Sequence, residues 1–269
     1  MLSKLHLSKS GYYNYLHRKP SKQSISKKER MQAIQTIYDD NHQIYGAPKI
    51  AKEMQKKGEK ISQRTVGVYM REMGIKACYI KPYVKTTFDS DFSTKLHNIL
   101  KRDFSPSKPN EAWCTDITYI FTLEGFVYLT SVMDLYSRKI IAWTLSKTLE
   151  VEEVLKCIEM ARKRRKTANS AIIHSDRGVH YTSKLYKKLT AGLILSYSKK
   201  GTPWDNACIE SFHSVIKREW LNRTLIYDYD HAYDLCFEYI ETFYNTIRIH
   251  SHCGYESPNQ YENNYYSKH

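Results

Sequence analysis

The stretch that decides the fold covers residues 113–119 and reads Trp113-Cys114-Thr115-Asp116-Ile117-Thr118-Tyr119. Apolar and polar side chains alternate along it, which predicts a β-strand with one face in the core. Asp116 lies in the middle of this strand, on the face opposite Trp113 and Ile117. Because an unpaired carboxylate is costly to bury, an acidic residue at this position indicates that something compensates its charge.

Three strands joined by short turns are expected around this stretch. Alternation runs through residues 113–121, 126–133 and 140–145, with turn sequences at Glu124-Gly125 and Ser137-Arg138. The elements expected next are a helix from Glu150 to about Lys166, a strand over 171–174, a helix over about 183–190, a strand over 193–196, a helix from about Trp204 to Leu221 and a helix over about 230–248. Hairpin strands followed by alternating helices and strands predict an α/β fold, a mixed sheet with helices on both faces.

Asp176 is the second candidate active-site residue. It follows the predicted strand 171–174, and open α/β sheets tend to place their sites at such strand ends. Gly178 allows the chain to turn after it. If this strand neighbours the first one, Asp176 and Asp116 lie side by side and repel each other unless a cation bridges them. Proximity of the two carboxylates would therefore predict a metal ion.

Glu210 is the third candidate, and it lies on the helix expected over about 204–221. The residues that share its helical face are Asn206, His213 or Ser214, and Lys217. A single acidic residue is usually just solvent-exposed. Two Asp and one Glu from two strand ends and a helix, however, are what a protein needs to hold a pair of hard divalent cations over a phosphodiester. The three together therefore predict an active site.

Positive charge is concentrated in the first part of the chain. The net charge is +14; residues 1–110 carry 22 Lys and Arg against 9 Asp and Glu, a net +13, and residues 111–269 carry 20 against 19, a net +1. Lys and Arg release condensed counterions when they neutralise phosphates, so this asymmetry favours a polyanionic partner for the N-terminal part. A basic but merely soluble surface is the alternative.

Three short helices are expected in this basic part. The first begins at Ser26 and runs to about Asp40, the second follows Tyr45-Gly46-Ala47-Pro48 and closes at Gly58, and the third runs from Ser62 to Gly74. They match a helix-turn-helix module whose third helix enters the major groove. The residues expected to face bases or phosphates are Gln63, Arg64 and Thr65. A plain three-helix bundle fits the periodicity equally well, and the local charge favours DNA.

Six scattered cysteines without a Cys-x-x-Cys pair are typical of reduced thiols in an intracellular protein. No apolar run is long enough for a membrane span, and the N-terminus has no signal-peptide core. We therefore expect a cytoplasmic protein without a membrane partner, associated with the bacterial nucleoid if it binds DNA.

A set of motifs resembles a known family. After residue 110 the motifs are Trp113-x-x-Asp116-Ile117-Thr118-Tyr119, His174-Ser175-Asp176-Arg177-Gly178-x-x-Tyr181-Thr182-Ser183, Ser198-x-Lys200-Gly201-x-x-Trp204-Asp205-Asn206-Ala207-x-x-Glu210-Ser211-Phe212, Tyr244-Asn245-x-x-Arg248-x-His250 and Gly254-Tyr255-x-Ser257-Pro258. Upstream they are Ser8-x-Ser10-Gly11-Tyr12-Tyr13 and Tyr45-Gly46-x-x-Lys49-Ile50. Across essentially its whole length, the chain resembles the second-reading-frame product of a bacterial insertion-sequence transposase, with an integrase core related to retroviral integrases.

The resemblance implies a ribonuclease-H-like core and a catalytic, metal-binding triad of Asp116, Asp176 and Glu210. The implied cofactors are two Mg²⁺ ions, with Mn²⁺ as a possible substitute, and the implied reaction is cleavage at the element ends followed by strand transfer. The residues expected to bind DNA are Lys217, Arg64, Thr65, Gln63, Lys49 and Arg248, and those expected to support the site are Asn206, His180 and Trp204.

The implied partners are the terminal inverted repeats, target DNA, further copies of the chain, and the first-reading-frame product or a frame fusion. The segment between Asp176 and Glu210 is slightly shorter than is usual in the family. We expect a shorter helix or loop between Ser183 and Ser198 that keeps both carboxylates in place.

The expected domains are an N-terminal helical piece and linker (1–25), the helix-turn-helix module (26–75), a linker (76–108), the catalytic core (109–225) and a C-terminal helix and tail (226–269). Two other functions remain open at this point. One is a nuclease on the same core that hydrolyses DNA or a hybrid without joining. The other is a DNA-binding regulator of transposition in which the core is only a scaffold.

Overall fold

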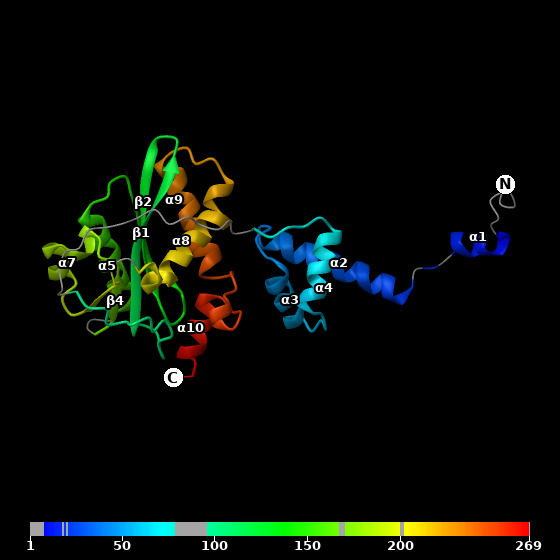
Figure 1. Cartoon of the computed structure of the whole chain (residues 1–269), viewed down its shortest axis with the longest axis horizontal. Helices are drawn as coiled ribbons and strands as arrows, with labels where there is room; N and C mark the ends of the chain where they lie inside the picture. Colours follow the sequence, from blue (N-terminus) through cyan, green and yellow to red (C-terminus); the bar gives the residue numbers. More distant parts are fainter. Residues whose placement is uncertain are drawn as a thin grey trace. The chain divides into compact units, whose positions relative to one another are not determined.

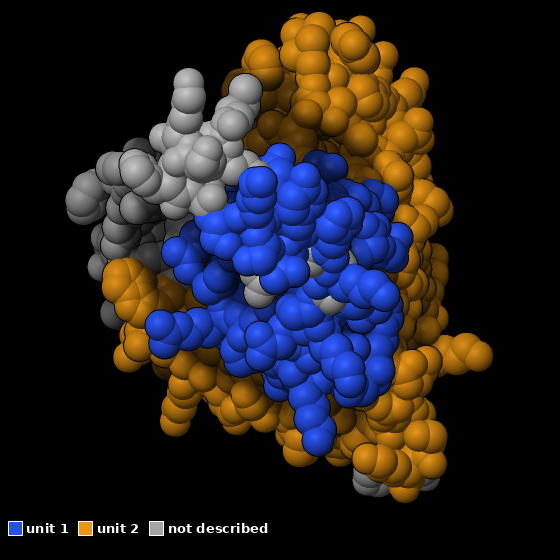
Figure 2. Space-filling view, turned by 90° about the vertical axis from the view of Figure 1, so that its right-hand side faces the viewer, with its two compact units in different colours: residues 1–78 blue, residues 79–269 orange. Residues whose placement is uncertain are grey.

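The computed structural model describes residues 8–17, 19, 21–78, 96–166, 170–199 and 202–268. Most of the expected linker 76–108, and Lys200 and Gly201 of the third motif, lie outside the described residues. The chain forms two compact units, residues 1–78 and residues 79–269, which Figure 2 shows in different colours. The C-terminal residues 226–269 belong to the second unit. No helix in the described part of the chain is long and apolar enough to cross a membrane.

The N-terminal unit is built from helices. They are α1 (Lys9–Leu16), α2 (Lys22–Asp40), α3 (Ala47–Lys56) and α4 (Gln63–Glu72). Each of the last three contributes two or more buried apolar residues to one small core: Ile34, Ile37, Ile50, Ala51, Met54, Val66 and Met70. This arrangement confirms the helical module expected from the sequence.

The ends of these helices follow their capping residues. Ser62 caps α4, since its side chain accepts a hydrogen bond from the backbone N–H of Thr65 at 3.1 Å. Gly74 follows α4 with φ +72, a conformation that glycine adopts without strain. The expected start of the first helix at Ser26 is wrong: α2 is capped by Ser21, which accepts from Ser24 N–H. Several serines in this stretch could cap a helix, and the sequence pattern selected the wrong one.

The second unit is built on a five-stranded mixed sheet. Its strands are β1 (Ala112–Thr122), β2 (Gly125–Asp134), β3 (Ile140–Ser146), β4 (Ile172–Ser175) and β5 (Ile194–Tyr197), in the order β3-β2-β1-β4-β5. β1, β2 and β3 pair antiparallel, whereas β4 lies parallel to both β1 and β5. β1 is therefore the central strand and lies next to β4, as the expected proximity of Asp116 and Asp176 requires.

Helices cover both faces of this sheet, as predicted. α5 (Val151–Arg165) packs against β2 and β3, and α8 (Ala207–Glu219) packs against β1 and β2 from the other side (Figure 1). The face toward α5 is an apolar core that includes Trp113, Val132 and Ile173. Since side chains alternate across a strand, Asp116 points to the α8 face. Ile209, Phe212 and Ile216 anchor α8, and all three are buried.

Several helices differ from the expected bounds. Between β4 and β5 lie two short helices, α6 (Val179–Thr182), which was not expected, and α7 (Lys184–Leu189). Pro203–Asn206 forms a 3-10 turn ahead of α8, and Leu221–Arg223 forms another after it. The helix expected over 230–248 is α9 (Tyr229–Phe237), which continues as a π-helix over Glu238–Tyr244. A further 3-10 turn covers Ser251–Cys253.

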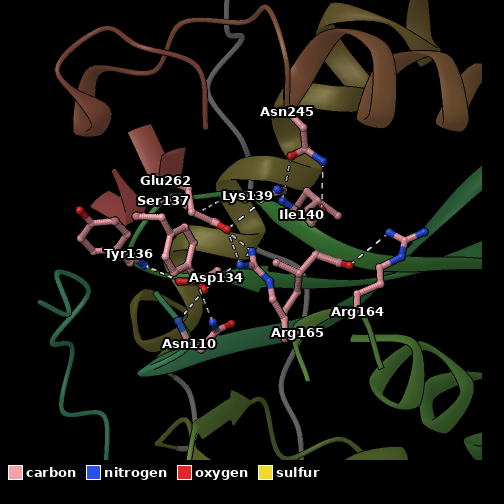
Figure 3. Close-up of polar contacts among 12 residues, drawn as sticks. Asn110, Asp134, Tyr136, Ser137, Lys139, Ile140, Arg164, Arg165, Asn245 and Glu262 are labelled. Atoms are coloured by element: carbon pink, nitrogen blue, oxygen red, sulfur yellow. Dashed lines mark hydrogen bonds and ion pairs between the residues drawn. The ribbon is translucent and has the colours of Figure 1, made fainter. Parts of the chain in front are cut away.

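A last helix, α10 (Pro258–Tyr266), replaces the expected irregular tail. Pro258 marks its beginning because proline fits the first turn of a helix, and Ser257 caps it by accepting from Gln260 N–H. Glu262 of α10 forms a two-pronged ion pair with Arg165 of α5 and accepts a hydrogen bond from Ser137 (Figure 3). Buried Asp134, at the end of β2, lies 4.0 Å from Arg165. We call Asp134, Lys139, Arg165 and Glu262 the latch cluster.

The open edge of β3 is covered by side chains. Asn245 accepts a hydrogen bond from the Ile140 N–H and donates one to the Ile140 carbonyl, both at 3.0 Å (Figure 3). Arg164 donates to the carbonyl of Ile141 at 3.2 Å. The motif residue Asn245 therefore continues the hydrogen-bond pattern of the sheet beyond its last strand.

Candidate active site

The pairing of β1 with β4 brings the two aspartates to corresponding positions. Cys114 pairs with His174 in the parallel register, and Asp116 and Asp176 each follow two residues later along their segments. Asp116 belongs to β1, and Asp176 comes directly after the end of β4. The register therefore brings the two segments together just before the aspartates, and the side-by-side placement of the two carboxylates stays a prediction.

Asp176 is held by the turn that follows it. Its Oδ1 accepts a hydrogen bond from the backbone N–H of Gly178 at 2.8 Å. A Cβ atom at residue 178 would lie only 3.0 Å from the same oxygen, so a side chain there would displace the carboxylate. Glycine is thus needed at position 178 because a side chain would crowd the Asp176 carboxylate, and not because the backbone has a positive φ angle.

Glu210 reaches this region from the first turn of α8. Burial raises the pKa of Glu210 to about 7, and the negative charges of Asp116 and Asp176 act in the same direction. The three carboxylates are therefore close enough to repel one another electrostatically. In the described part of the chain, no three acidic, His or Cys side chains lie close enough together to hold a metal ion. What the fold provides is three carboxylates whose mutual repulsion a divalent cation would relieve.

Lys217 provides a cation at the same place, two turns along α8 from Glu210. Its Nζ lies 4.2 Å from the ring centroid of Tyr119 on β1, which is a cation–π contact. Burial lowers the pKa of Lys217, and Asp116 opposes that effect. The aromatic ring and the nearby carboxylate together fix the position of this ammonium group.

The three residues expected to support the site differ in their surroundings. Asn206 is only 3 % exposed; its Nδ2 donates to the Thr115 carbonyl of β1 at 3.3 Å, whereas its buried Oδ1 has no hydrogen-bond partner. His180 has its Nε2 3.1 Å from the Leu149 carbonyl. Trp204 is 55 % exposed. Of these, Asn206 makes the direct link between the start of α8 and the strand that carries Asp116.

The residues expected to bind DNA in the N-terminal unit fall into two groups. Gln63 and Arg64 are exposed at the start of α4, and Thr65 is half-buried with its hydroxyl 2.9 Å from that of Ser62. Lys49 instead has a buried Nζ that lies 4.5 Å from the ring centroid of Tyr45. We therefore correct its expected role: Lys49 stabilises the module from within, because its ammonium group is directed onto an aromatic face.

Arg248 also requires a correction. It is 7 % exposed, and its guanidinium donates two hydrogen bonds of 2.7 Å to Glu219 of α8. Tyr239 donates a third hydrogen bond to the same carboxylate at 2.7 Å. This buried pair ties the C-terminal helices to α8, so the guanidinium is not offered to DNA.

Two polar residues, Asp205 and His213, were not among the site residues expected from the sequence. Asp205 accepts hydrogen bonds from Asn98, Arg102 and the Lys199 N–H, so it joins the loop before α8 to an earlier segment. His213 is buried beside Asp116, with 3.5 Å between its Nδ1 and Asp116 Oδ2. Its place three residues after Glu210 on the same helix was the available signal, but the helical spacing alone did not separate His213 from Ser214.

Known domain families match the chain in three places. Residues 106–203 and residues 191–258 match two families that are both described as "Integrase core domain". Residues 26–83 match an "HTH-like domain". The fold and the site thus define an integrase-core protein with a ribonuclease-H-like sheet and an N-terminal helix-turn-helix-like module.

Whole-chain relatives give the particular family. The transposase for insertion sequence element IS904 of Lactococcus lactis is 34% identical over 249 residues, which cover 92% of this chain and 98% of the relative. Transposase InsF for insertion sequence IS3A of Escherichia coli is 33% identical over 266 residues, covering 96% and 91%. The chain therefore belongs to the IS3-type insertion-sequence transposases, and its function is DNA transposition.

Two solved structures of viral integrases align with parts of the chain. The HTLV-2 integrase catalytic core domain in complex with magnesium covers 58% of this chain and 98% of its own length, with 16% identity and a TM-score of 0.46. The simian T-cell lymphotropic virus intasome in complex with a PP2A regulatory subunit covers 85% and 74%, with 13% identity and a TM-score of 0.49.

Proposed function

We propose that Asp116, Asp176 and Glu210 hold two divalent cations, Mg²⁺ with Mn²⁺ as a substitute, at which the chain cleaves the ends of its element and joins them to target DNA. The observation that carries this proposal is the parallel register of β1 and β4, which brings together the segments of two carboxylates that Glu210 approaches from α8. Oxygen ligands of this kind suit Mg²⁺ and Mn²⁺.

Metal ions bound by these carboxylates would activate the attacking oxygen and stabilise the leaving oxygen of the phosphodiester. The protein's own residues prepare that reaction. Lys217, held on Tyr119, places a positive charge where the phosphates of a DNA end would approach Asp116. Asn206 fixes the start of α8 to β1 and so sets the position of Glu210. We also propose that His180 and Trp204 support the site, as the family motifs imply, and no covalent protein intermediate is needed.

DNA binding by the N-terminal unit is the second part of the proposal. Gln63 and Arg64 are exposed at the first turn of α4, where a helix-turn-helix protein contacts base edges, and Thr65 follows them. Residues 1–78 carry 16 Lys and Arg against 6 Asp and Glu, and this net charge of +10 supports a phosphate-binding surface. The partners are the terminal inverted repeats and target DNA, further copies of the chain on that DNA, and the first-frame product or a frame fusion.

Asp116→Asn tests the triad. The purified chain is given duplex DNA from an element end with a 3′-hydroxyl, Mg²⁺ and a plasmid target. The variant should keep DNA binding but lose strand transfer by roughly a thousandfold or more, because removing a metal ligand costs several kcal/mol of barrier stabilisation. Glu159→Gln, an exposed carboxylate on α5, is the matched control and should act like the parent.

The products separate the alternatives. Joined DNA from the parent supports the transposase reaction, nicking without joining supports a nuclease, and retention without any cleavage supports a regulator. Strand transfer by Asp116→Asn at the parent rate would disprove the triad assignment.

A further inference from the structure

A buried histidine lies over the strand pair that carries Asp116. The antiparallel register of β1 and β2 places Asp116 directly opposite Ser131, so the two side chains share the face toward α8. His213 of α8 is 5 % exposed and reaches both residues. Its Nδ1 lies 3.5 Å from Asp116 Oδ2, and its Nε2 lies 3.3 Å from Ser131 Oγ.

These neighbours determine which polar group each ring nitrogen faces. A carboxylate oxygen only accepts hydrogen bonds, so the ring nitrogen that faces Asp116 must carry a hydrogen. On the other side of the ring, Nε2 faces the Ser131 hydroxyl, which can donate or accept. Ser131 thereby fixes the orientation of His213, and His213 directs an N–H at Asp116.

We propose that His213 is a positioning residue that holds Asp116 Oδ2 and leaves Oδ1 for the metal ion. The proposal rests on the metal-binding role proposed above for Asp116. The same helix carries Glu210 three residues earlier, so one contact orients the Asp carboxylate and also sets its separation from Glu210. Groups that orient metal ligands in this way typically contribute 10–100-fold to metal affinity.

Simple packing is the alternative role for this residue. The His213 ring lies next to Phe212, with 5.6 Å between ring centroids, and an apolar ring would fill the same space. Three substitutions separate packing from positioning. His213→Phe keeps a ring but no N–H. His213→Asn keeps an N–H close to the position of Nδ1. His213→Gln places its amide near the position of Nε2 and offers no donor toward Asp116.

The measurement is Mn²⁺ binding to the full chain, monitored by the loss of the free Mn²⁺ signal in electron paramagnetic resonance. His213→Phe and His213→Gln should weaken Mn²⁺ binding by roughly tenfold or more, and His213→Asn should restore most of it. His97→Phe, at an exposed histidine, is the control and should bind like the parent. Melting curves without metal identify any variant that fails to fold, and His213→Gln replaces His213→Phe if that one does.

Unchanged Mn²⁺ affinity in a folded His213→Phe or His213→Gln variant would overturn the proposal. Equal weakening in His213→Asn would overturn it as well, because the loss would then follow from ring shape and not from the N–H. Asp116→Asn distinguishes these outcomes from a failure of the proposed function. If Asp116→Asn itself binds Mn²⁺ like the parent, the metal site is wrong; if it loses binding while His213→Phe does not, only the role of His213 is wrong.

Discussion

The triad and the latch cluster are two acidic sites of the second unit, and they differ in what surrounds the carboxylates. In the latch cluster, Asp134 accepts hydrogen bonds from the backbone N–H groups of Asn110 and Tyr136 and lies near Arg165 (Figure 3). Glu262 is paired with the same arginine, which lowers its pKa despite burial. At the triad, burial raises the pKa of Glu210, and the charges of Asp116 and Asp176 raise it further.

The difference separates a structural role from a functional one. In the latch cluster, cations and N–H donors of the protein oppose the cost of burying the carboxylates. They do so fully enough at Glu262 to lower its pKa, but not at Asp134. In the triad the carboxylates repel one another, which lowers the stability of the protein, and the metal ions proposed above would relieve this repulsion. Surrounding charge, rather than burial, distinguishes the two sites.

Removing one carboxylate from each site should change stability in opposite directions. Glu262→Gln breaks a buried ion pair and leaves Arg165 with only the more distant Asp134, so the free energy of unfolding should fall by roughly 3–5 kcal/mol. Glu210→Gln removes one of three like charges, so the melting temperature should rise at pH 8 in EDTA. Thermal melts of both variants beside the parent provide the check. A decrease for Glu210→Gln comparable with that for Glu262→Gln would remove the distinction between the sites.

The pH dependence of the free energy of unfolding tests how well the charge of Asp134 is compensated in the latch cluster. Burial raises the pKa of Asp134 to about 6, against the opposing effect of Arg165. The folded protein therefore holds this proton more tightly than the unfolded chain does, so the stabilisation is complete below about pH 4 and is lost as the pH rises through 6. A shift of about two pH units corresponds to roughly 2–3 kcal/mol.

Urea unfolding of the parent and of Asp134→Asn between pH 4 and 7 measures this contribution. The variant leaves one backbone N–H without its acceptor and is less stable throughout, but the difference between the two proteins should change by roughly 2 kcal/mol over the range. A difference that stays constant with pH would show that Asp134 titrates normally.

The smallest expected effect is at Gly178, beside Asp176. Gly178→Ala places a methyl group 3.0 Å from Asp176 Oδ1, so the carboxylate must shift and strand transfer should fall by about tenfold, which is ~1.4 kcal/mol of barrier. Gly11→Ala is the control, since its Cβ would meet Ser8 at an ordinary 3.7 Å. Initial rates of joining for both variants test this. Parent-like joining by Gly178→Ala would mean that Asp176 tolerates displacement.

Much of the fold could be predicted from the sequence because its signals are local. Alternation fixed the three hairpin strands to within one or two residues, and Ser62 and Gly74 marked the ends of α4. No helix was expected in the tail after residue 248, although Ser257 and Pro258 are a capping serine and a proline of the kind that begins a helix. Local signals predicted where the strands are but not which strands lie next to each other, so the sequence alone did not establish that β1 pairs with β4.

The site residues also divide into those that the sequence could identify and those that it could not. Asp116, Asp176 and Glu210 could be selected from their residue type and position in an element, and the metal role remains a prediction. Lys49 and Arg248 were assigned to DNA from charge and motif alone, and the structure directs both cations inward. A one-dimensional pattern does not show which face of a helix a motif residue occupies, nor that Glu219 lies opposite Arg248. The same limit concealed the contact of His213 with Asp116.

The covered edge of β3 has a consequence for self-association. A free strand edge invites another chain to extend the sheet, which is a common route to aggregation. Here the amide of Asn245 satisfies both backbone groups of Ile140, and Arg164 occupies the carbonyl of Ile141. An incoming strand would have to displace these side chains before it could pair with Ile140 or Ile141. Asn245 thus protects this end of β3 from pairing with a strand of another molecule.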